Sequence, residues 1–232
     1  MRPVVCYVTD RKALARAPGA DPAEVLLEKV RAAVHAGVDW VQIREKDLLG
    51  GKLLPLTLEA IASVRDMAPT PGSHRTLIYI NDRLDVAIAA GAAGVHLGSE
   101  SMPIADVVRW RRAGNAPVEF QIGASCHSVE SARDAARDGA NYVFFGPVFD
   151  TPSKRGFGPP QGLERLREVC QAVEIPVIAI GGVNEANADE CIRAGASGIA
   201  AIRFFQEAAT AEKIGGFVSR LRAAGNTQSV RH

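Results

Sequence analysis

The fold is decided by the stretch Tyr142-Val143-Phe144-Phe145-Gly146-Pro147-Val148-Phe149-Asp150-Thr151-Pro152-Ser153-Lys154-Arg155-Gly156-Phe157-Gly158-Pro159-Pro160. Its first four residues are β-branched or aromatic, which predicts a buried strand. Gly146-Pro147 ends this strand, and a loop with two hydroxyls and two cations follows. Such groups on a glycine-containing loop can hold a phosphate or pyrophosphate, although a solvated surface loop has the same composition.

The same alternation of apolar strand and amphipathic helix runs along the whole chain. Strands are predicted at 4–9, 39–44, 77–81, 94–98, 119–124, 141–146, 176–181 and 198–203. Helices are predicted at 22–36, 53–67, 84–90, 103–112, 128–138, 162–173, 185–194 and 207–223. Eight strand–helix units in 232 residues predict an α/β fold, a single-domain (β/α)8 TIM barrel over residues 1–232. A doubly wound open sheet is the competing fold.

A weak internal repeat supports the barrel. Gly37, Gly91, Gly139 and Gly195 each follow a helical pattern and lead into a strand. A glycine just past a helix end adopts the left-handed conformation without steric cost. Their spacing of roughly 50 residues matches two strand–helix units, as expected of a barrel built from similar modules.

Composition narrows the class of protein. The chain has 27 Lys plus Arg against 26 Asp plus Glu, so it lacks the basic excess of a nucleic-acid-binding protein. No apolar run approaches the roughly 18 residues of a membrane span, and no signal-peptide pattern precedes the first strand. Cys6, Cys126, Cys170 and Cys191 are scattered and lack metal-type spacing, so we expect reduced thiols, no zinc site and a cytoplasmic protein.

In a barrel of this kind the active site lies at the C-terminal ends of the strands. The second strand delivers Gln42, Arg44 and Lys46 to one side, and Ile43 and Glu45 to the other. If the first side faces the barrel, its two cations need anionic partners. A substrate phosphate would supply them; an internal network with carboxylates of neighbouring strands is the alternative.

The next two strands also end in polar residues. Asn81 and Asp82 stand at the end of the third strand and suit a metal or a substrate amine, although Asp82 also suits a helix N-cap. Glu100 and Ser101 follow the fourth strand at a helix start. His96, inside that strand, is interpreted as a core histidine or one that supports the site.

The remaining strand ends complete the candidate site. Ser125 and His127 are candidates for polar contact or proton transfer, and Ser128 is a predicted helix cap. Gly181-Gly182 and Ile202-Arg203 end the seventh and eighth strands. Loops at these two positions of a barrel commonly bind a phosphate through backbone N–H groups, so we expect a phosphorylated ligand.

Six motifs, taken in order along nearly the whole chain, resemble those of the thiamine phosphate synthase/TenI family of phosphate-binding barrels. They are Gln42-x-Arg44-x-Lys46, Asn81-Asp82, Gly94-Val95-His96-Leu97-Gly98, Gly123-x-Ser125-x-His127, Gly146-Pro147-Val148-Phe149-x-Thr151-x-Ser153-Lys154 and Ala179-Ile180-Gly181-Gly182. The resemblance implies the barrel fold and a transferase of thiamine biosynthesis. This enzyme joins 4-amino-2-methyl-5-hydroxymethylpyrimidine diphosphate to thiazole phosphate and releases pyrophosphate.

The family reaction passes through a pyrimidine carbocation, formed as Mg2+-bound pyrophosphate leaves, so preplaced cations and Mg2+ lower the barrier. By motif position, the pyrimidine diphosphate would be held by Gln42, Arg44, Lys46, Asn81, Ser125 and Lys154. The thiazole phosphate would be held by Thr151, Ser153, Gly181, Gly182, Ile202 and Arg203. Catalysis is expected from Lys154, Arg44 and Ser125, with His127 as a further candidate.

Two positions depart from the family. Ser101 stands where a second Mg2+ carboxylate is usual, and a hydroxyl is the poorer ligand for a hard cation. Glu100 is the candidate replacement, so the expected metal residues are Asp82, Glu100 and Ser101. Arg203 replaces the usual serine after the eighth strand, where its amide or its side chain would meet the phosphate.

Two other functions stay open. The segment 154–163 resembles TenI-type relatives, which implies a thiazole tautomerase without Mg2+ in which His127 does the acid–base work. Against it, the TenI branch typically lacks the Gln-x-Arg-x-Lys and Asn-Asp motifs, and this chain has both, as Gln42, Arg44, Lys46, Asn81 and Asp82. A non-catalytic barrel that binds thiamine precursors is the third reading. Loop 150–160 is predicted to close over the site as a lid. A homo-oligomer is possible, because related barrels pair through helices outside the site.

Overall fold

The computed structural model describes residues 2–14, 18–67, 75–151, 159–208 and 210–228, without the side chains of 225–228. Within these residues, eight parallel strands form a closed barrel in chain order, and β8 pairs with β1 to close the ring. The strands are β1 (Val4–Val8), β2 (Trp40–Ile43), β3 (Leu77–Asn81), β4 (Gly94–Leu97), β5 (Gln121–Cys126), β6 (Tyr142–Phe145), β7 (Val177–Ile180) and β8 (Gly198–Ala201). The predicted TIM barrel is confirmed.

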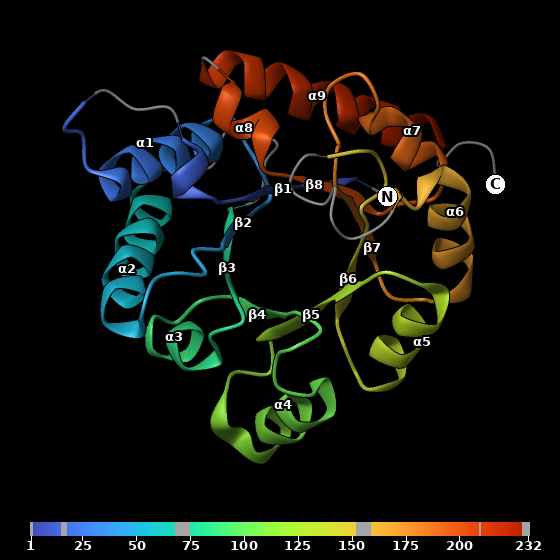
Figure 1. Cartoon of the computed structure of the whole chain (residues 1–232), viewed down its shortest axis with the longest axis horizontal. Coiled ribbons are helices and arrows are strands. Elements are labelled where there is room, and N and C mark those ends of the chain that lie inside the picture. The colour runs from blue at the N-terminus through green and yellow to red at the C-terminus, as the bar shows by residue number, and fades with distance from the viewer. Residues whose placement is uncertain (1, 15–17, 68–74, 152–158, 209, 229–232) are drawn as a thin grey trace.

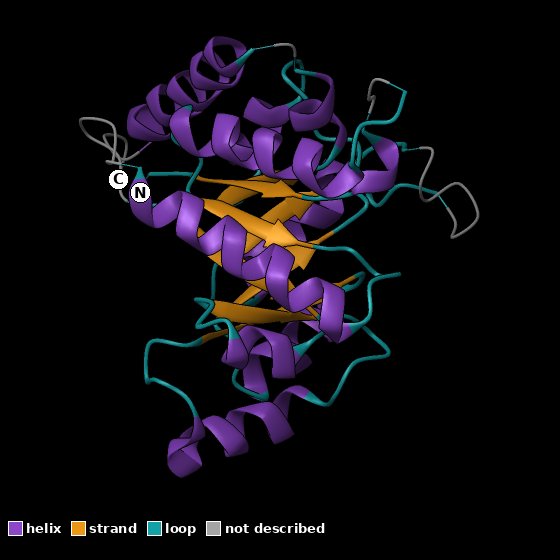
Figure 2. Cartoon of the chain, turned by 90° about the vertical axis from the view of Figure 1, so that its left-hand side faces the viewer, coloured by secondary structure: helices purple, strands orange, loops and turns teal. Residues whose placement is uncertain are grey.

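Helices surround the barrel and cover the outer face of its sheet (Figures 1 and 2). They are η1 (Arg11–Ala13), α1 (Pro22–His35), α2 (Gly50–Asp66), α3 (Leu84–Ala89), α4 (Ile104–Trp110), η2 (Arg111–Asn115), α5 (Val129–Arg137), α6 (Gly162–Ala172), α7 (Ala188–Arg193), α8 (Arg203–Glu207) and α9 (Ala211–Gln228). No helix in the described part of the chain has both the length and the apolar character needed to cross a bilayer.

Several predicted boundaries were wrong. The fifth strand spans Gln121–Cys126 rather than 119–124, because Phe120 N–H donates to the Pro117 carbonyl (3.0 Å) in a turn just before it. The eighth strand ends at Ala201 and is followed by an unpredicted helix, α8, and the expected helix at 207–223 is α9, which spans Ala211–Gln228. Arg203 therefore begins a helix instead of ending a strand. The short η1 after β1 was not predicted.

The four repeat glycines confirm their predicted conformation. Gly37, Gly91, Gly139 and Gly195 have φ values of 85°, 66°, 96° and 106°. Each N–H donates to a carbonyl of the last helical turn, for example Gly37 to Val34 (2.9 Å). These left-handed ends return the chain to the next strand of the barrel.

Two apolar layers result from the alternation of side chains along each strand. Cys6, Val8, Phe144 and their neighbours fill the barrel interior, whereas the other face of the strands packs on the helices. In the interior, the rings of Trp40, Tyr79 and Tyr142 pack with centroids 4.8–5.6 Å apart. These rings fill the interior of the barrel. A cavity lies beyond them, at the C-terminal ends of the strands.

Candidate active site

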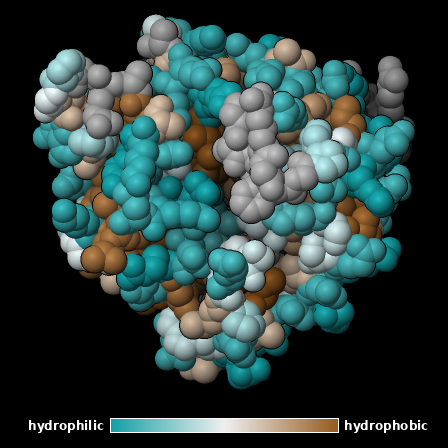
Figure 3. Space-filling view, in the orientation of Figure 1, coloured by the Kyte–Doolittle hydropathy of each residue, from teal (hydrophilic) through white to brown (hydrophobic). Residues whose placement is uncertain are grey.

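A cavity of about 780 Å³ lies at the C-terminal ends of the strands and has wall residues from all of them. The face shown in Figure 3 is hollowed near its centre, and hydrophilic residues lie along the border. Every described residue that the sequence predicted for the site lines this cavity. These are Gln42, Arg44, Lys46, Asn81, Asp82, Glu100, Ser101, Ser125, His127, Thr151, Gly181, Gly182, Ile202 and Arg203. Ser153, Lys154 and most of the predicted lid lie outside the described residues.

The end of β2 presents two cations to the cavity. Gln42, Arg44 and Lys46 line it, whereas Glu45 points to the other side and is buried, as the alternation predicts. Neither Arg44 nor Lys46 forms an ion pair with a carboxylate of the described residues. The Gln42 side-chain N–H2 is buried and donates to no acceptor within the same part of the chain. The predicted alternative of an internal ion-pair network is therefore wrong for these residues, and the site is suited to an anion.

Asp82 follows β3, the strand next to β2, and has a left-handed backbone conformation. Its backbone φ is 69°, a value that residues other than glycine rarely adopt. The N-cap interpretation was wrong, because Arg83 is the N-cap residue of α3 and no side chain caps that helix. Instead, the Asp82 carboxylate accepts a hydrogen bond from the Ser101 hydroxyl, which itself accepts the Gly98 N–H (2.6 Å). The structure thus holds the carboxylate at the cavity wall.

Few side chains near Asp82 could ligate a metal. Glu100 and Ser101 line the same cavity. Across the described residues, no group of three or more His, Cys, Asp and Glu side chains is placed to hold a metal by itself. Any cation bound here would therefore complete its coordination with a ligand or water.

His96 supports the floor of the site. It is 1% exposed, and its Nε2 lies 2.9 Å from the Ser125 hydroxyl, while Nδ1 lies 3.4 Å from the Tyr142 hydroxyl. Burial, and then the nearby Arg44 charge, lower the pKa of His96 to about 3. His96 is therefore neutral near pH 7 and orients Ser125, which agrees with its interpretation as a supporting histidine.

The lowered pKa of His96 has a consequence for stability. The unfolded chain binds a proton on this residue with an ordinary pKa near 6.5, whereas the folded protein does not until about pH 3. The stability that comes from keeping His96 neutral is therefore fully present above the pKa of the unfolded chain. It is lost as the pH falls from that pKa toward the pKa of the folded protein. We expect the free energy of unfolding to drop by about 2 kcal/mol from this group between pH 7 and pH 5.

Urea unfolding at the two pH values measures this loss. His96→Gln keeps the hydrogen-bonding capacity without the titration, so its loss over the same interval is expected to be smaller by that amount. Equal losses in the two proteins would contradict the prediction.

His127 lies at the cavity edge with its ring orientation fixed. Its Nδ1 contacts the Gly146 carbonyl, which only accepts, so Nδ1 carries the proton and Nε2 has the free lone pair in the neutral ring. Its backbone N–H donates to the Ser131 hydroxyl (3.1 Å). Ser128 and Ser131 form a capping box at the start of α5, which confirms the predicted cap.

On the β7 side of the cavity, a turn of two glycines contributes backbone to the wall. Gly181 and Gly182 have φ values of 92° and 69°. A Cβ on Gly182 would lie 2.6 Å from the Asp150 carbonyl oxygen, so only glycine fits. The N–H groups of both glycines donate to no acceptor within the described residues. The turn therefore has backbone N–H groups, without an acceptor among those residues, as the predicted phosphate site requires.

The other half of the predicted phosphate site differs from the expectation. Arg203 occupies the first turn of α8, its side chain is 57% exposed, and its Nε lies 3.5 Å from Glu207 Oε1. Ile202 is the N-cap residue, so the chain enters a helix at the point where the prediction extended the strand. Both residues still line the cavity.

Some cavity residues were missed from the sequence. Asp10 had a usable signal, because it is the first charged residue after the first strand. Phe144 is at an inward position of β6, where strand alternation could have placed it. Gln206 had no signal, because it belongs to the unpredicted helix α8.

Comparison with known proteins identifies the family. The thiamine monophosphate synthase (TMP-TENI) family model matches residues 6–205. A thiamine-phosphate synthase of Roseiflexus castenholzii is 41% identical over 201 residues, 87% of this chain and 80% of the relative. That of Methanoculleus marisnigri is 44% identical over 172 residues, 74% and 76% of the two chains. The solved thiamine phosphate pyrophosphorylase of Pyrococcus furiosus superimposes with a TM-score of 0.76 at 32% identity, covering 95% of each chain. The chain therefore belongs to the thiamine monophosphate synthase family.

Proposed function

We propose that this protein is a thiamine-phosphate synthase, which joins 4-amino-2-methyl-5-hydroxymethylpyrimidine diphosphate to thiazole phosphate. The observation that carries the proposal is the pair of cations, Arg44 and Lys46, that line the cavity without a described carboxylate to neutralise them. The names of the relatives support the same activity. A diphosphate would supply the anionic partner that these two side chains lack among the described residues.

The wall suits the departure of pyrophosphate. In the reaction the pyrimidine carbon–oxygen bond breaks, and its electron pair leaves with the pyrophosphate. Arg44 and Lys46 stabilise the negative charge that develops on the departing group. The thiazole nitrogen then donates its electron pair to the cationic carbon and forms the new carbon–nitrogen bond. Gln42 and Ser125, at the floor of the cavity, orient the pyrimidine.

The donor set beside Asp82 fits Mg2+. This ion takes oxygen ligands and in such sites is held by one or two carboxylates together with substrate phosphates and water. Asp82 and Glu100 supply carboxylates, and Ser101 fixes one Asp82 oxygen. When bound, Mg2+ would neutralise charge on the pyrophosphate.

The second phosphate is assigned to the Gly181-Gly182 turn. Two backbone N–H groups without described acceptors can donate to phosphate oxygens, and the absence of side chains lets the anion approach. Thr151 lines the same cavity. The motif resemblance adds Ser153 and Lys154.

The test is a product assay with both substrates, with and without Mg2+. Mg2+-dependent formation of thiamine phosphate is the expected result. Proton exchange on the thiazole carboxylate phosphate without condensation, lost in His127→Ala, would instead establish a tautomerase. Tight binding of the precursors with no turnover in either assay would establish a binding protein.

The Ser101 position gives a second prediction. Ser101→Asp adds a carboxylate next to Asp82, and ligand charge increases the affinity for hard divalent cations. We expect the apparent Kd for Mn2+ in the presence of pyrophosphate to fall about tenfold, measured by isothermal titration calorimetry. The matched control is Ser99→Asp, a residue of the same loop that lacks the contact with Asp82. A similar gain in both variants would show that charge alone is responsible.

The proposal includes a cytoplasmic location, for which the cysteines are the support. All four are free thiols, and burial raises the pKa of Cys126 to about 11 and of Cys191 to about 12. Such thiols react slowly, as expected of structural cysteines in a reducing compartment.

A further inference from the structure

Glu45 is a buried carboxylate that faces away from the cavity, between its two cationic neighbours Arg44 and Lys46. Its side chain is 1% exposed. Thr9 Oγ1 donates to Glu45 Oε1 (2.6 Å), and the Arg11 N–H lies 3.1 Å from both carboxylate oxygens. Arg11 Nη1 donates to Oε2 (3.0 Å). Both oxygens are therefore engaged, and the charge is neutralised from the side opposite to the substrate cavity.

Thr9 connects this carboxylate to the backbone of Arg44. The Thr9 hydroxyl accepts the Arg44 N–H (2.9 Å) while donating to Glu45, and the Thr9 N–H donates to the Gln42 carbonyl (2.9 Å). Thr9 is fully buried. Since β2 ends at Ile43, these bonds continue the pairing of β1 and β2 past the last strand residue. The backbone thus stays extended where alternation must turn Arg44 toward the cavity.

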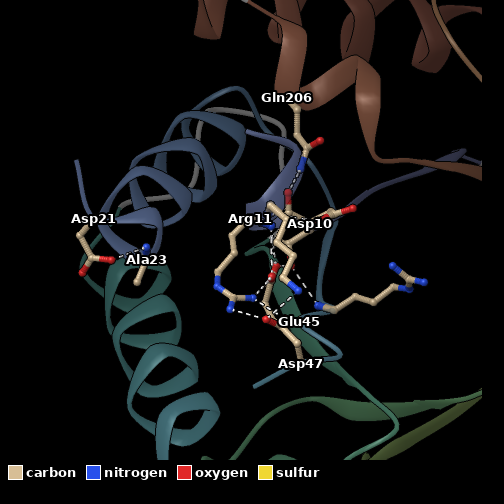
Figure 4. A network of polar contacts seen from close by, with 10 residues as sticks. Asp10, Arg11, Asp21, Ala23, Glu45, Asp47 and Gln206 are labelled. Carbon is tan, nitrogen blue, oxygen red and sulfur yellow. Dashed lines mark hydrogen bonds and ion pairs between the residues drawn. The ribbon is translucent and has the colours of Figure 1, made fainter. Parts of the chain in front are cut away.

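Arg11 also contacts a second, exposed carboxylate, that of Asp47. Arg11 forms a two-pronged ion pair with Asp47, Nη1 to Oδ1 at 2.6 Å and Nη2 to Oδ2 at 2.8 Å. Figure 4 shows Arg11 between Glu45 and Asp47, and Gln206 of α8 reaching Asp10. The hydrogen bonds from Arg11 and Lys12 hold the pKa of Asp47 well below its usual range. Asp47 makes no contact with Thr9, which makes it the matched control.

We propose that Glu45, acting through Thr9, is a positioning residue that directs Arg44 at the leaving pyrophosphate. The inference rests on the proposed function for its substrate. Arg44 has no ion-pair partner among the described residues that could fix its direction, so its backbone must do so. The hydrogen bonds of Thr9 to the Arg44 N–H and to the Glu45 carboxylate fix that backbone.

The experiment compares Thr9→Val and Glu45→Gln with Asp47→Asn. Pyrophosphate affinity is measured by calorimetry, and kcat and KM are measured for each substrate. Thr9→Val, which keeps the side-chain volume, is expected to weaken pyrophosphate binding and to lower kcat/KM for the pyrimidine diphosphate about tenfold. The KM for thiazole phosphate and all constants of Asp47→Asn are expected to stay within about twofold of wild type.

A double-mutant cycle with Arg44→Met distinguishes positioning from general damage. If Glu45 and Thr9 act through Arg44, adding Thr9→Val to Arg44→Met costs less than about twofold, so the two effects are not additive. Full additivity, or wild-type pyrophosphate affinity in a folded Thr9→Val protein, would overturn the inference. Because Glu45→Gln leaves Arg11 without its buried partner, it can lose its fold, and Thr9→Val then carries the test.

Pyrophosphate binding and product formation test the positioning role and the proposed function separately. A wild-type protein that binds pyrophosphate but forms no thiamine phosphate would overturn the proposed function alone. The pyrophosphate titrations of the variants would still measure the effect of Thr9 and Glu45 on Arg44.

Discussion

We expect Arg44→Met to lower kcat/KM for the pyrimidine diphosphate by about 100- to 1,000-fold, the usual effect of removing one preplaced donor from a developing oxyanion. Arg44 is half-buried in the cavity wall and has no ion-pair partner among the described residues, so its charge is available to the leaving group. Methionine keeps much of the apolar stem and removes only the charge and the donors. Steady-state kinetics with both substrates measures the change.

The charge and the geometry of this residue can be separated. Arg44→Lys restores the charge without the planar pair of donors, so we expect it to recover only part of the lost activity. Arg109→Met is the control, because Arg109 is exposed on α4 and pairs with Asp106 (3.0 Å). A loss in Arg44→Met no greater than in this control would exclude Arg44 from the reaction.

Gly182→Ala is the second change with a large expected effect. Its φ of 69° is unfavourable for alanine by about 1–2 kcal/mol. The new Cβ would also lie 2.6 Å from the Asp150 carbonyl oxygen and 2.7 Å from Phe149 Cβ, so the β6–α6 loop must shift. We expect KM for thiazole phosphate to rise by at least about tenfold and Tm to fall by several degrees.

A second glycine gives the control for this substitution. Gly216 lies in α9, and a Cβ there would meet nothing within 4 Å. Gly216→Ala is therefore expected to raise the free energy of unfolding by about 0.5–1 kcal/mol and to leave the kinetics unchanged. Wild-type KM in a Gly182→Ala protein would show that this turn does not hold the phosphate.

The parts of the site that lie on strands were predictable from the sequence. A period of two residues is sufficient to place Gln42, Arg44 and Lys46 on one face and Glu45 on the other. The strand order of a barrel then brings this strand end to the same opening as Gly181-Gly182. Strand alternation and the strand order of a barrel are therefore sufficient to predict these parts of the site.

The parts that depend on contacts between loops were not predictable. An aspartate before a helix suits an N-cap, and only the φ of Asp82 and its contact with Ser101, 19 residues away, exclude that role. The start of α8 at Arg203 is set by tertiary packing, since Phe204 and Phe205 pack on Phe217 and Tyr7. Neither contact leaves a periodic signal in the sequence.

The closure of the barrel has a consequence for synthesis of the protein. Gln206 Nε2 donates to the Asp10 carbonyl (2.5 Å) across 196 residues, and β8 completes the ring beside β1. A nascent chain on the ribosome that has released only β1 to β7 therefore has Arg44, Lys46 and Asp82 but not the closed ring that holds their strands together. Ligand capture should begin only after α8 emerges, so pyrophosphate can stabilise the finished enzyme and cannot rescue an arrested chain.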